Sequence, residues 1–284
     1  MAEQMKSELV PRPRAAWLAD AKWIVGILCF FVVGATAVVG TLTKLTERET
    51  ALTIDSVVMA SMFSPKGLDD PGDIDKVRAN LANHPTQTIK PNPNLNVTLT
   101  SADVAGKSPR EIRLLIFRRV AEPIYDQAKL TTGPSDTSVT ENPSLANAGL
   151  LAFLSRSSHD QLTRGLRFML IADAVLLLAL VGLSVGFGRL ASPGWVLLLA
   201  SVVPMLVVAA GSAYHVSYAA SAGSEDGPNF GAIVASAAGS VVPTIIGTIR
   251  SVYQPLLMIG AGLIAVATLG GIVWHLVQRL KKTA

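Results

Sequence analysis

The stretch WIVGILCFFVVGATAVVGTLT, residues Trp23–Thr43, decides the fold of this chain, because it carries no charged side chain and is long enough to cross a bilayer as one helix. A helical crossing of the hydrocarbon core takes about 20 apolar residues. Three later stretches have the same character, with at most one charge each: Phe168–Phe187, Trp195–Ala213 and Pro255–Val277. The sequence therefore predicts four transmembrane helices.

Composition supports the same class of protein. The 284 residues are 50% hydrophobic and 15% charged, whereas soluble globular proteins carry about 25% charged residues. The four apolar stretches account for the deficit of charge, so it reflects membrane crossings and not an oversized soluble core. The single cysteine, Cys29, lies inside the first stretch, so no intrachain disulfide is available to stabilise the rest of the chain.

The distribution of basic residues predicts the orientation. Residues 44–165 carry fourteen Lys/Arg and fourteen Asp/Glu, so this region is neutral and the net charge of +4 does not indicate nucleic-acid binding. Because short basic segments face the cytoplasm, we expect cytoplasmic N- and C-termini in a multi-pass protein of the cell (plasma) membrane. The basic residues on that side are Lys6, Arg12, Arg14, Lys22, Arg189, Arg279, Lys281 and Lys282.

The expected fold is an all-α integral membrane protein with a mainly helical extracytoplasmic domain inserted between transmembrane helices 1 and 2. Ala35-Thr36-Ala37 resembles a signal-peptidase site, but the apolar run continues to Leu42, which favours an uncleaved anchor. The predicted segments are a cytoplasmic tail 1–22, a transmembrane helix 23–43, the extracytoplasmic domain 44–165, transmembrane helices 166–188 and 195–213, a second extracytoplasmic loop 214–254, a transmembrane helix 255–278 and a cytoplasmic tail 279–284.

The second extracytoplasmic loop contains an apolar segment of its own, Phe230–Ile249, which is uncharged and about as long as a crossing. Apolar pairs such as Val241-Val242 recur every four residues in it, and small residues fill the gaps. We expect a helix that lies at the outer interface or packs on the outer domain. A fifth crossing and a re-entrant segment are the alternatives.

The clearest local signal in the inserted region is Ser108–Glu111. Ser108 suits the N-cap, Pro109 the first helical position and Glu111 the third, so a helix is predicted to begin at Pro109 and to end or kink at Pro123. Residues Asn94–Thr100 alternate polar and apolar side chains, which predicts a half-buried strand.

Weaker signals predict further helix starts. The spacing of Thr46 and Glu49 is that of a capping box, and Asp73 suits the cap of a short helix through Leu81. A helix is expected over Pro143–Leu154, and Ser158 is expected to cap another that continues unbroken into the second transmembrane helix.

Asp173 is the charged residue inside the predicted transmembrane helices. It lies about two turns, or roughly 10 Å, from the outer end of the second helix. A carboxylate at that depth is costly unless it is paired or protonated, so Asp173 is the candidate functional residue, suited to handling a proton or cation or to docking a cationic partner. The structural alternative is a hydrogen bond to Ser201, Tyr214 or Thr268 on a neighbouring helix, or to water that reaches the carboxylate from the nearby surface.

Other motif-like strings have plainer interpretations. Ala105-Gly106-Lys107-Ser108 matches the end of a phosphate-binding loop, but Ser101 stands where the first glycine is required. Gly260–Ala265 has the glycine spacing of a dinucleotide site but lies in a predicted membrane helix, where small residues permit close packing. The acidic run Asp69, Asp70, Asp73 and Asp75 lacks the spacing of a calcium loop. We therefore predict no catalytic residue, cofactor or metal.

The order of segments is similar to that of cell-division permeases of the FtsX type: a tail, one helix, an outer domain and three helices. The resemblance is architectural, and in those proteins a longer cytoplasmic segment between helices 2 and 3 can couple to an ATPase. Here that segment, Gly188–Gly194, has about seven residues. This difference argues against an ATPase-coupled subunit.

The functional expectation is a non-enzymatic accessory, scaffolding or partner-binding protein. Its expected partners are the lipid bilayer and other membrane or extracytoplasmic proteins, with no nucleic acid or nucleotide. The alternative is a small permease or ion-coupled carrier that uses Asp173. A third hypothesis, a sensor whose outer domain signals inward, is disfavoured by the short cytoplasmic segments.

The predicted orientation is testable by thiol labelling in intact cells. Cysteine introduced at Ser135 is expected to react with a membrane-impermeant reagent, and cysteine at Thr283 is expected not to react until the cells are opened. Labelling of both positions in intact cells would indicate five crossings, and labelling of the Thr283 position alone would indicate an inverted chain.

Overall fold

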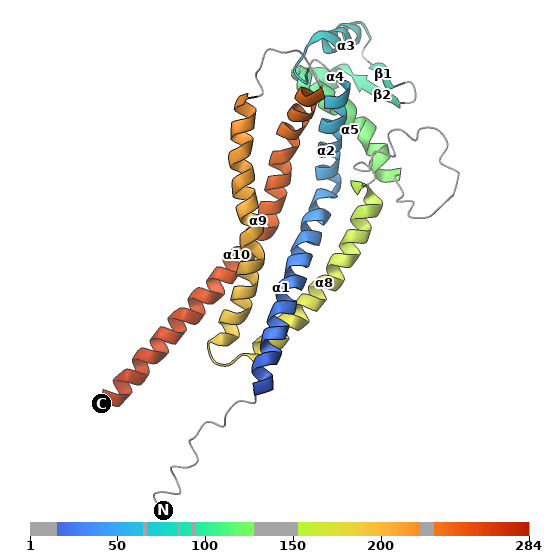
Figure 1. Ribbon diagram of the computed structural model, residues 1–284. Coiled ribbons are helices and arrows are strands. Elements are labelled where there is room, and N and C mark those ends of the chain that lie inside the picture. Colours follow the sequence, from blue (N-terminus) through green and yellow to red (C-terminus); the bar gives the residue numbers. More distant parts are fainter. Residues whose placement is uncertain are drawn as a thin grey trace, which may run out of the picture. The chain divides into compact units, whose positions relative to one another are not determined.

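The computed structural model describes residues 16–64, 67–84, 86–92, 95–127, 153–221 and 230–283 (Figure 1). The chain divides into two compact units. Unit 1 comprises Met1–Thr36, Phe168–Val203 and Gln254–Ala284, and unit 2 comprises Ala37–Arg167 and Pro204–Tyr253.

Four long helices carry the apolar stretches: α1 (Ala16–Leu45), α8 (Arg156–Leu183), α9 (Gly188–Ser221) and α10 (Phe230–Thr283). Within the described residues, four segments are long and apolar enough to cross a membrane: Trp17–Leu45, Arg156–Leu183, Gly188–Ser212 and Gly239–Lys281. The prediction of four such helices is confirmed, and it indicates a multi-pass membrane protein.

Helix α10 corrects the predicted course of residues 214–254. α9 continues to Ser221, and α10 runs unbroken from Phe230 through Pro255, the predicted start of the last span. The sequence predicts a helix in Phe230–Ile249 and a separate transmembrane helix at 255–278. That separation is wrong, because both lie in α10. A proline inside a helix removes one hydrogen bond, but in membrane proteins neighbouring groups often satisfy the freed carbonyl, so Pro255 need not mark a helix start.

Unit 1 is held by a small apolar core and by close backbone contact. The buried core residues are Cys29 and Val33 of α1, Leu180 of α8, and Val196, Leu197 and Ala200 of α9. Gly260 of α10 lies directly on α9: a Cβ atom added there would stand 2.7 Å from the Leu198 nitrogen and 2.9 Å from the Gly194 oxygen. This contact requires glycine, so Gly260 serves close helix packing, as predicted.

The described residues between α1 and α8, here called the inserted domain, belong to unit 2. Its elements are α2 (Arg48–Phe63), α3 (Gly72–Asn83), β1 (Thr86–Asn92), β2 (Leu95–Thr100), α4 (Ser101–Val104) and α5 (Pro109–Gln127). Buried side chains of α2, β2 and α5 form one core, in which Leu52, Leu99 and Ile112 are fully buried. The inserted domain is therefore predominantly helical.

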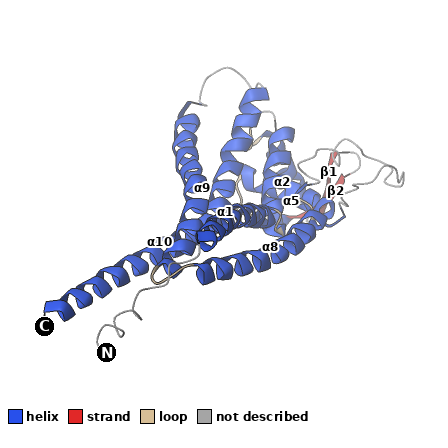
Figure 2. Ribbon diagram, turned by 60° about the horizontal axis from the view of Figure 1, so that its bottom comes forward, coloured by secondary structure: helices blue, strands red, loops and turns tan. Residues whose placement is uncertain are grey.

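β1 and β2 pair as an antiparallel hairpin (Figure 2). Among the described residues, this hairpin is the one β-sheet. Thr86 pairs with Thr100 and Ile89 with Val97, and the register shifts between Ile89 and Asn92. The predicted strand is thus confirmed as β2. The sequence does not predict β1, because Pro91 lies near its end and proline is disfavoured in strands except at edges and bulges.

The first half of α10 packs on the inserted domain within unit 2. Arg110 donates from Nη2 to the Ser240 hydroxyl at 2.8 Å, and Val241 packs against the domain core. Lys44, at the end of α1, donates to the Ser251 hydroxyl at 3.0 Å. The contacts of Ser240 and Val241 thus join this part of α10 to the inserted domain.

The predicted cap at Ser108 is confirmed. α5 begins at Pro109. The Glu111 amide donates to Ser108 Oγ at 3.3 Å, and the Ser108 amide donates to Glu111 Oε2 at 2.7 Å. The Ser108 amide and hydroxyl, which both donate to Glu111 Oε2, hold the pKa of the Glu111 carboxyl below its usual value. α5 continues to Gln127, so Pro123 does not end it.

The predicted capping box at Thr46 is wrong. The Thr46 hydroxyl donates to Leu42 O at 3.0 Å, and the residue at the N-cap of α2 is Glu47, whose side chain makes no capping bond. Threonine hydroxyls readily donate to the carbonyl four residues back, which competes with capping the next helix.

Two further caps also differ from the prediction. Asp73 lies in the first turn of α3, whose N-cap is Pro71. α8 begins before Ser158, and the Ser158 amide donates to Ser155 Oγ at 3.4 Å. α8 does run unbroken into the second span, as predicted. The helix predicted over Pro143–Leu154 lies outside the described residues except for its last two positions.

Replacing Ser108 by alanine is expected to destabilise the first turn of α5 by about 1 kcal/mol, because the Glu111 amide loses its acceptor. Hydrogen exchange of the amides at the start of α5 in the full chain measures this loss. Ser108→Thr keeps a hydroxyl and is the matched control. Equal protection in the alanine and threonine variants would contradict the prediction.

Candidate functional site

Asp173 is buried within unit 1. Its side chain is 8% exposed, and its Oδ1 atom accepts no hydrogen bond from the described residues. Thr36 of α1 is the polar side chain beside the carboxylate, but the Thr36 hydroxyl donates to Val32 O at 2.9 Å. The carboxylate is thus enclosed by protein and incompletely satisfied, which is uncommon for a buried polar group.

The helical repeat of α8 explains this placement. Leu176, Leu177 and Leu180 follow Asp173 by three, four and seven residues, and all three pack in the core of unit 1. On the other faces of α8, Phe168 is 75% exposed and Leu178 is 71% exposed. Asp173 therefore lies on the packed face of its helix and not on the face available to lipid.

Of the three hydrogen-bond partners predicted for Asp173, the two whose side chains are described, Ser201 and Thr268, bond elsewhere. The Ser201 hydroxyl donates to Leu197 O at 2.8 Å, within its own helix. Thr268 is exposed and donates to Ile264 O at 2.8 Å. The side chain of Tyr214 lies outside the described residues. The neighbouring hydroxyl is that of Thr36, which the sequence does not single out.

Two cavities in the described residues bear on function, and Asp173 lines neither. One, of about 590 Å³, lies in the inserted domain between α3 and α4. The other, of about 500 Å³, lies in unit 1 along α1 and α9. Because a carrier needs a polar cavity beside its ion-binding carboxylate, these two cavities give no support to transport through Asp173.

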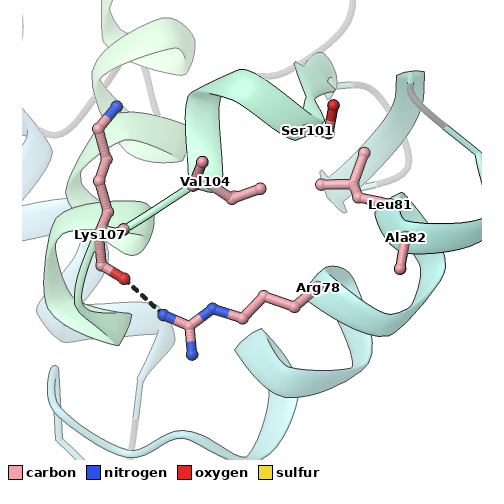
Figure 3. Close-up of a pocket in the computed structure, with 8 residues that line it drawn as sticks. Arg78, Leu81, Ala82, Ser101, Val104 and Lys107 are labelled. Carbon is pink, nitrogen blue, oxygen red and sulfur yellow. Dashed lines mark hydrogen bonds between the residues drawn. The ribbon is translucent and has the colours of Figure 1, made fainter.

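The cavity in the inserted domain contains the residues that match the end of a phosphate-binding loop (Figure 3). Arg78 donates to Lys107 O and pairs with Asp75 at 3.3 Å. Figure 3 shows the Lys107 ammonium directed away from Arg78, so the two cations do not converge on one ligand. Gly106 has a φ of +69°, the left-handed conformation that glycine adopts at a turn. These residues build the turn into α5.

The acidic run is distributed over separate ion pairs. Asp69 pairs with Arg110 and Asp70 with Arg113, both at 3.8 Å, and Asp73 pairs with Lys76 at 3.6 Å. In the described part of the chain, no three His, Cys, Asp or Glu side chains gather as possible metal ligands. The acidic side chains thus face basic partners and not one another.

Asp55 of α2 is a second buried carboxylate, which the sequence analysis does not single out. It is 1% exposed, and Oδ1 has no hydrogen-bond partner in the described residues. Burial raises the pKa of the Asp55 carboxyl from 3.8 to about 7. The available sequence signal is that Asp55 is the one charge in Thr50–Phe63, the same signal that identifies Asp173.

Comparisons with models of protein families, with curated proteins and with solved structures find no match to this chain.

Asp55 is expected to make the stability of the inserted domain depend on pH. Between pH about 4 and about 7 the unfolded carboxyl loses its proton while the folded one retains it. The free energy of unfolding therefore falls as the pH rises through this range and is flat above it. A difference between 3.8 and about 7 corresponds to roughly 4 kcal/mol.

Thermal unfolding of the full chain in detergent between pH 4 and pH 8 tests this expectation. Asp55→Asn is expected to remove the decline and to be more stable than the wild type at pH 8. The control, Asp73→Asn, changes a carboxylate that is 86% exposed and is expected to keep the decline. A wild-type slope that persists in Asp55→Asn would show that other groups cause it.

Proposed function

We propose that this chain is an integral membrane accessory or scaffolding protein that binds partner proteins. In this proposal it is a multi-pass protein of the cell membrane with cytoplasmic termini, and the inserted domain is extracytoplasmic, which the distribution of basic residues supports. The role is not enzymatic, and the partners include neither nucleic acid nor nucleotide.

The observation that carries the proposal is an exposed face of small residues on α10. Ala261, Gly262, Ala265 and Thr268 are exposed, and a Cβ atom added at Gly262 would meet nothing within 4 Å. This face is distinct from the one that holds Gly260 against α9. Small residues allow the backbones of two membrane helices to approach closely.

Glycine inside a helix is destabilising by about 0.5–1 kcal/mol relative to alanine. At Gly260 that cost is offset by the contact with α9, which a Cβ atom would prevent. At Gly262 no contact among the described residues requires glycine. A helix of a partner protein packed on this face would explain the small side chains.

The end of α10 offers additional surface. Every side chain from Ile272 to Lys281 is exposed, including Trp274 at 59% and Leu280 at 69%. This end of the helix therefore remains available to lipid and to other membrane proteins.

Site-specific photo-crosslinking in native membranes tests the proposal. A photoreactive residue at Val266, which is 58% exposed beside the small-residue face, is expected to give a discrete protein adduct that mass spectrometry identifies. Gly262→Leu is expected to reduce that adduct several-fold, because the added side chain separates the helices. Gly34→Leu on α1, also at an open position, is the matched control. An adduct unaffected by Gly262→Leu, or lipid adducts alone, would contradict the proposal.

A small permease or ion-coupled carrier is the second candidate, favoured by the incompletely satisfied carboxylate of Asp173. For a carrier, Asp173→Asn is expected to abolish transport while expression and assembly stay intact, since the amide keeps the shape but not the charge. For a scaffold, the same change is expected to be nearly silent. Asp173→Ala is then expected to be more harmful than Asp173→Asn, because it also removes a polar group that faces Thr36.

A further inference from the structure

The cavity of about 500 Å³ in unit 1 is a groove that combines apolar walls with one cation. α1 contributes Lys22, Trp23 and Phe30, and α9 contributes Ser192, Trp195 and Leu199. Gly26 forms part of the floor: a Cβ atom added there would lie 3.9 Å from Leu180 Cδ1. The absence of a side chain at Gly26 therefore helps to keep the groove open.

The groove is polar at one end and apolar along its length. Lys22 and Ser192 both lie near the starts of their membrane-crossing segments, Trp17–Leu45 and Gly188–Ser212. Phe30 lies eight residues beyond Lys22, which is about 12 Å along a helix. A ligand that fills the groove must have a polar group at one end and an apolar chain of at least that length.

The polar end favours an anion. Lys22 is half-buried and forms no ion pair with a carboxylate of the described residues, and its ammonium nitrogen lies 4.0 Å from the Cβ position of Gly188 at the turn between α8 and α9. The Ser192 hydroxyl lies 3.1 Å from the Ser184 hydroxyl, whose one proton also has Leu180 O as an acceptor at 2.7 Å. Lys22 is therefore the donor that this end of the groove offers to an anion. A phosphate group would satisfy the Lys22 ammonium through charge-assisted hydrogen bonds.

The surroundings of the groove identify the source of that phosphate. Trp23 is 74% exposed and Trp195 is 52% exposed at the same end, and tryptophan is enriched at the level of lipid headgroups. The walls lie on helices that are apolar enough to span a membrane, where the molecules available to fill a groove are lipids. Basic pockets between transmembrane helices are known sites for anionic headgroups.

We propose that this groove binds one anionic phospholipid, with its phosphate at Lys22 and an acyl chain lying over Gly26 toward Phe30 and Leu199. The site is independent of the orientation of the chain in the membrane and of the partner-binding face on α10. Its failure and the failure of the scaffolding proposal are therefore distinguishable.

The test is native mass spectrometry of the full chain released from nanodiscs that contain equal amounts of phosphatidylglycerol and phosphatidylcholine. The wild type is expected to retain one phosphatidylglycerol in preference to phosphatidylcholine. Lys22→Gln is expected to lower the retained ratio of the two lipids by about fivefold, the effect of one basic residue near an anionic surface. Lys281→Gln removes an exposed basic residue outside the groove and is expected to leave the ratio unchanged.

A second pair of variants tests the part of the groove that holds the acyl chain separately from the part that holds the headgroup. Gly26→Leu fills the floor of the groove and is expected to abolish retention of either lipid, whereas Gly34→Leu on the same helix is expected to retain it. Equal retention of the two lipids by the wild type overturns the proposal. An equal effect of Lys281→Gln and Lys22→Gln also overturns it, because it would indicate diffuse attraction to basic residues. Because Lys22→Gln leaves the apolar packing unchanged, it decides the question even if Gly26→Leu does not fold.

Discussion

The structure depends first on the need of every backbone amide and carbonyl in hydrocarbon to find a partner within the protein. The four long helices meet this need by themselves, and their hydroxyl side chains follow the same rule. Thr36, Thr41 and Ser201 each donate to the carbonyl four residues back, at 2.8–2.9 Å. An ionised carboxylate cannot donate to such a carbonyl. Asp173 is therefore a buried group of unit 1 that its own helix cannot satisfy.

This rule explains which features the sequence predicts and which it does not. The four spans can be predicted from the sequence because each depends on a local apolar stretch. The Ser108 cap can be predicted because it depends on residues 108–111 alone. The hydrogen-bond partners of Asp173 are not predictable in this way, because Ser201 and Thr268 bind carbonyls of their own helices. The groove at Lys22 is also invisible in the sequence, since its lining comes from residues far apart on α1, α8 and α9.

The buried charged groups of the chain differ in how completely they are satisfied. Arg113 is 6% exposed, yet its guanidinium donates to Leu68 O at 2.6 Å and pairs with Asp70 at 3.8 Å. Asp55 has no comparable partner for its Oδ1 atom. A buried charge without partners is costly, and a carboxyl group avoids the cost by keeping its proton. Arginine has no such option, which is why Arg113 needs its full set of acceptors.

The surfaces of α9 keep the proposed lipid site of unit 1 apart from the proposed partner site. Gly194 and Leu198 meet Gly260 of α10, whereas Trp195 and Leu199 line the groove that α1 completes. Gly262 is two residues beyond Gly260, which is about 200° around a helix with 3.6 residues per turn, so the open small-residue face of α10 points away from α9. The proposed partner helix and the proposed lipid therefore contact different helices, and neither needs to displace the other.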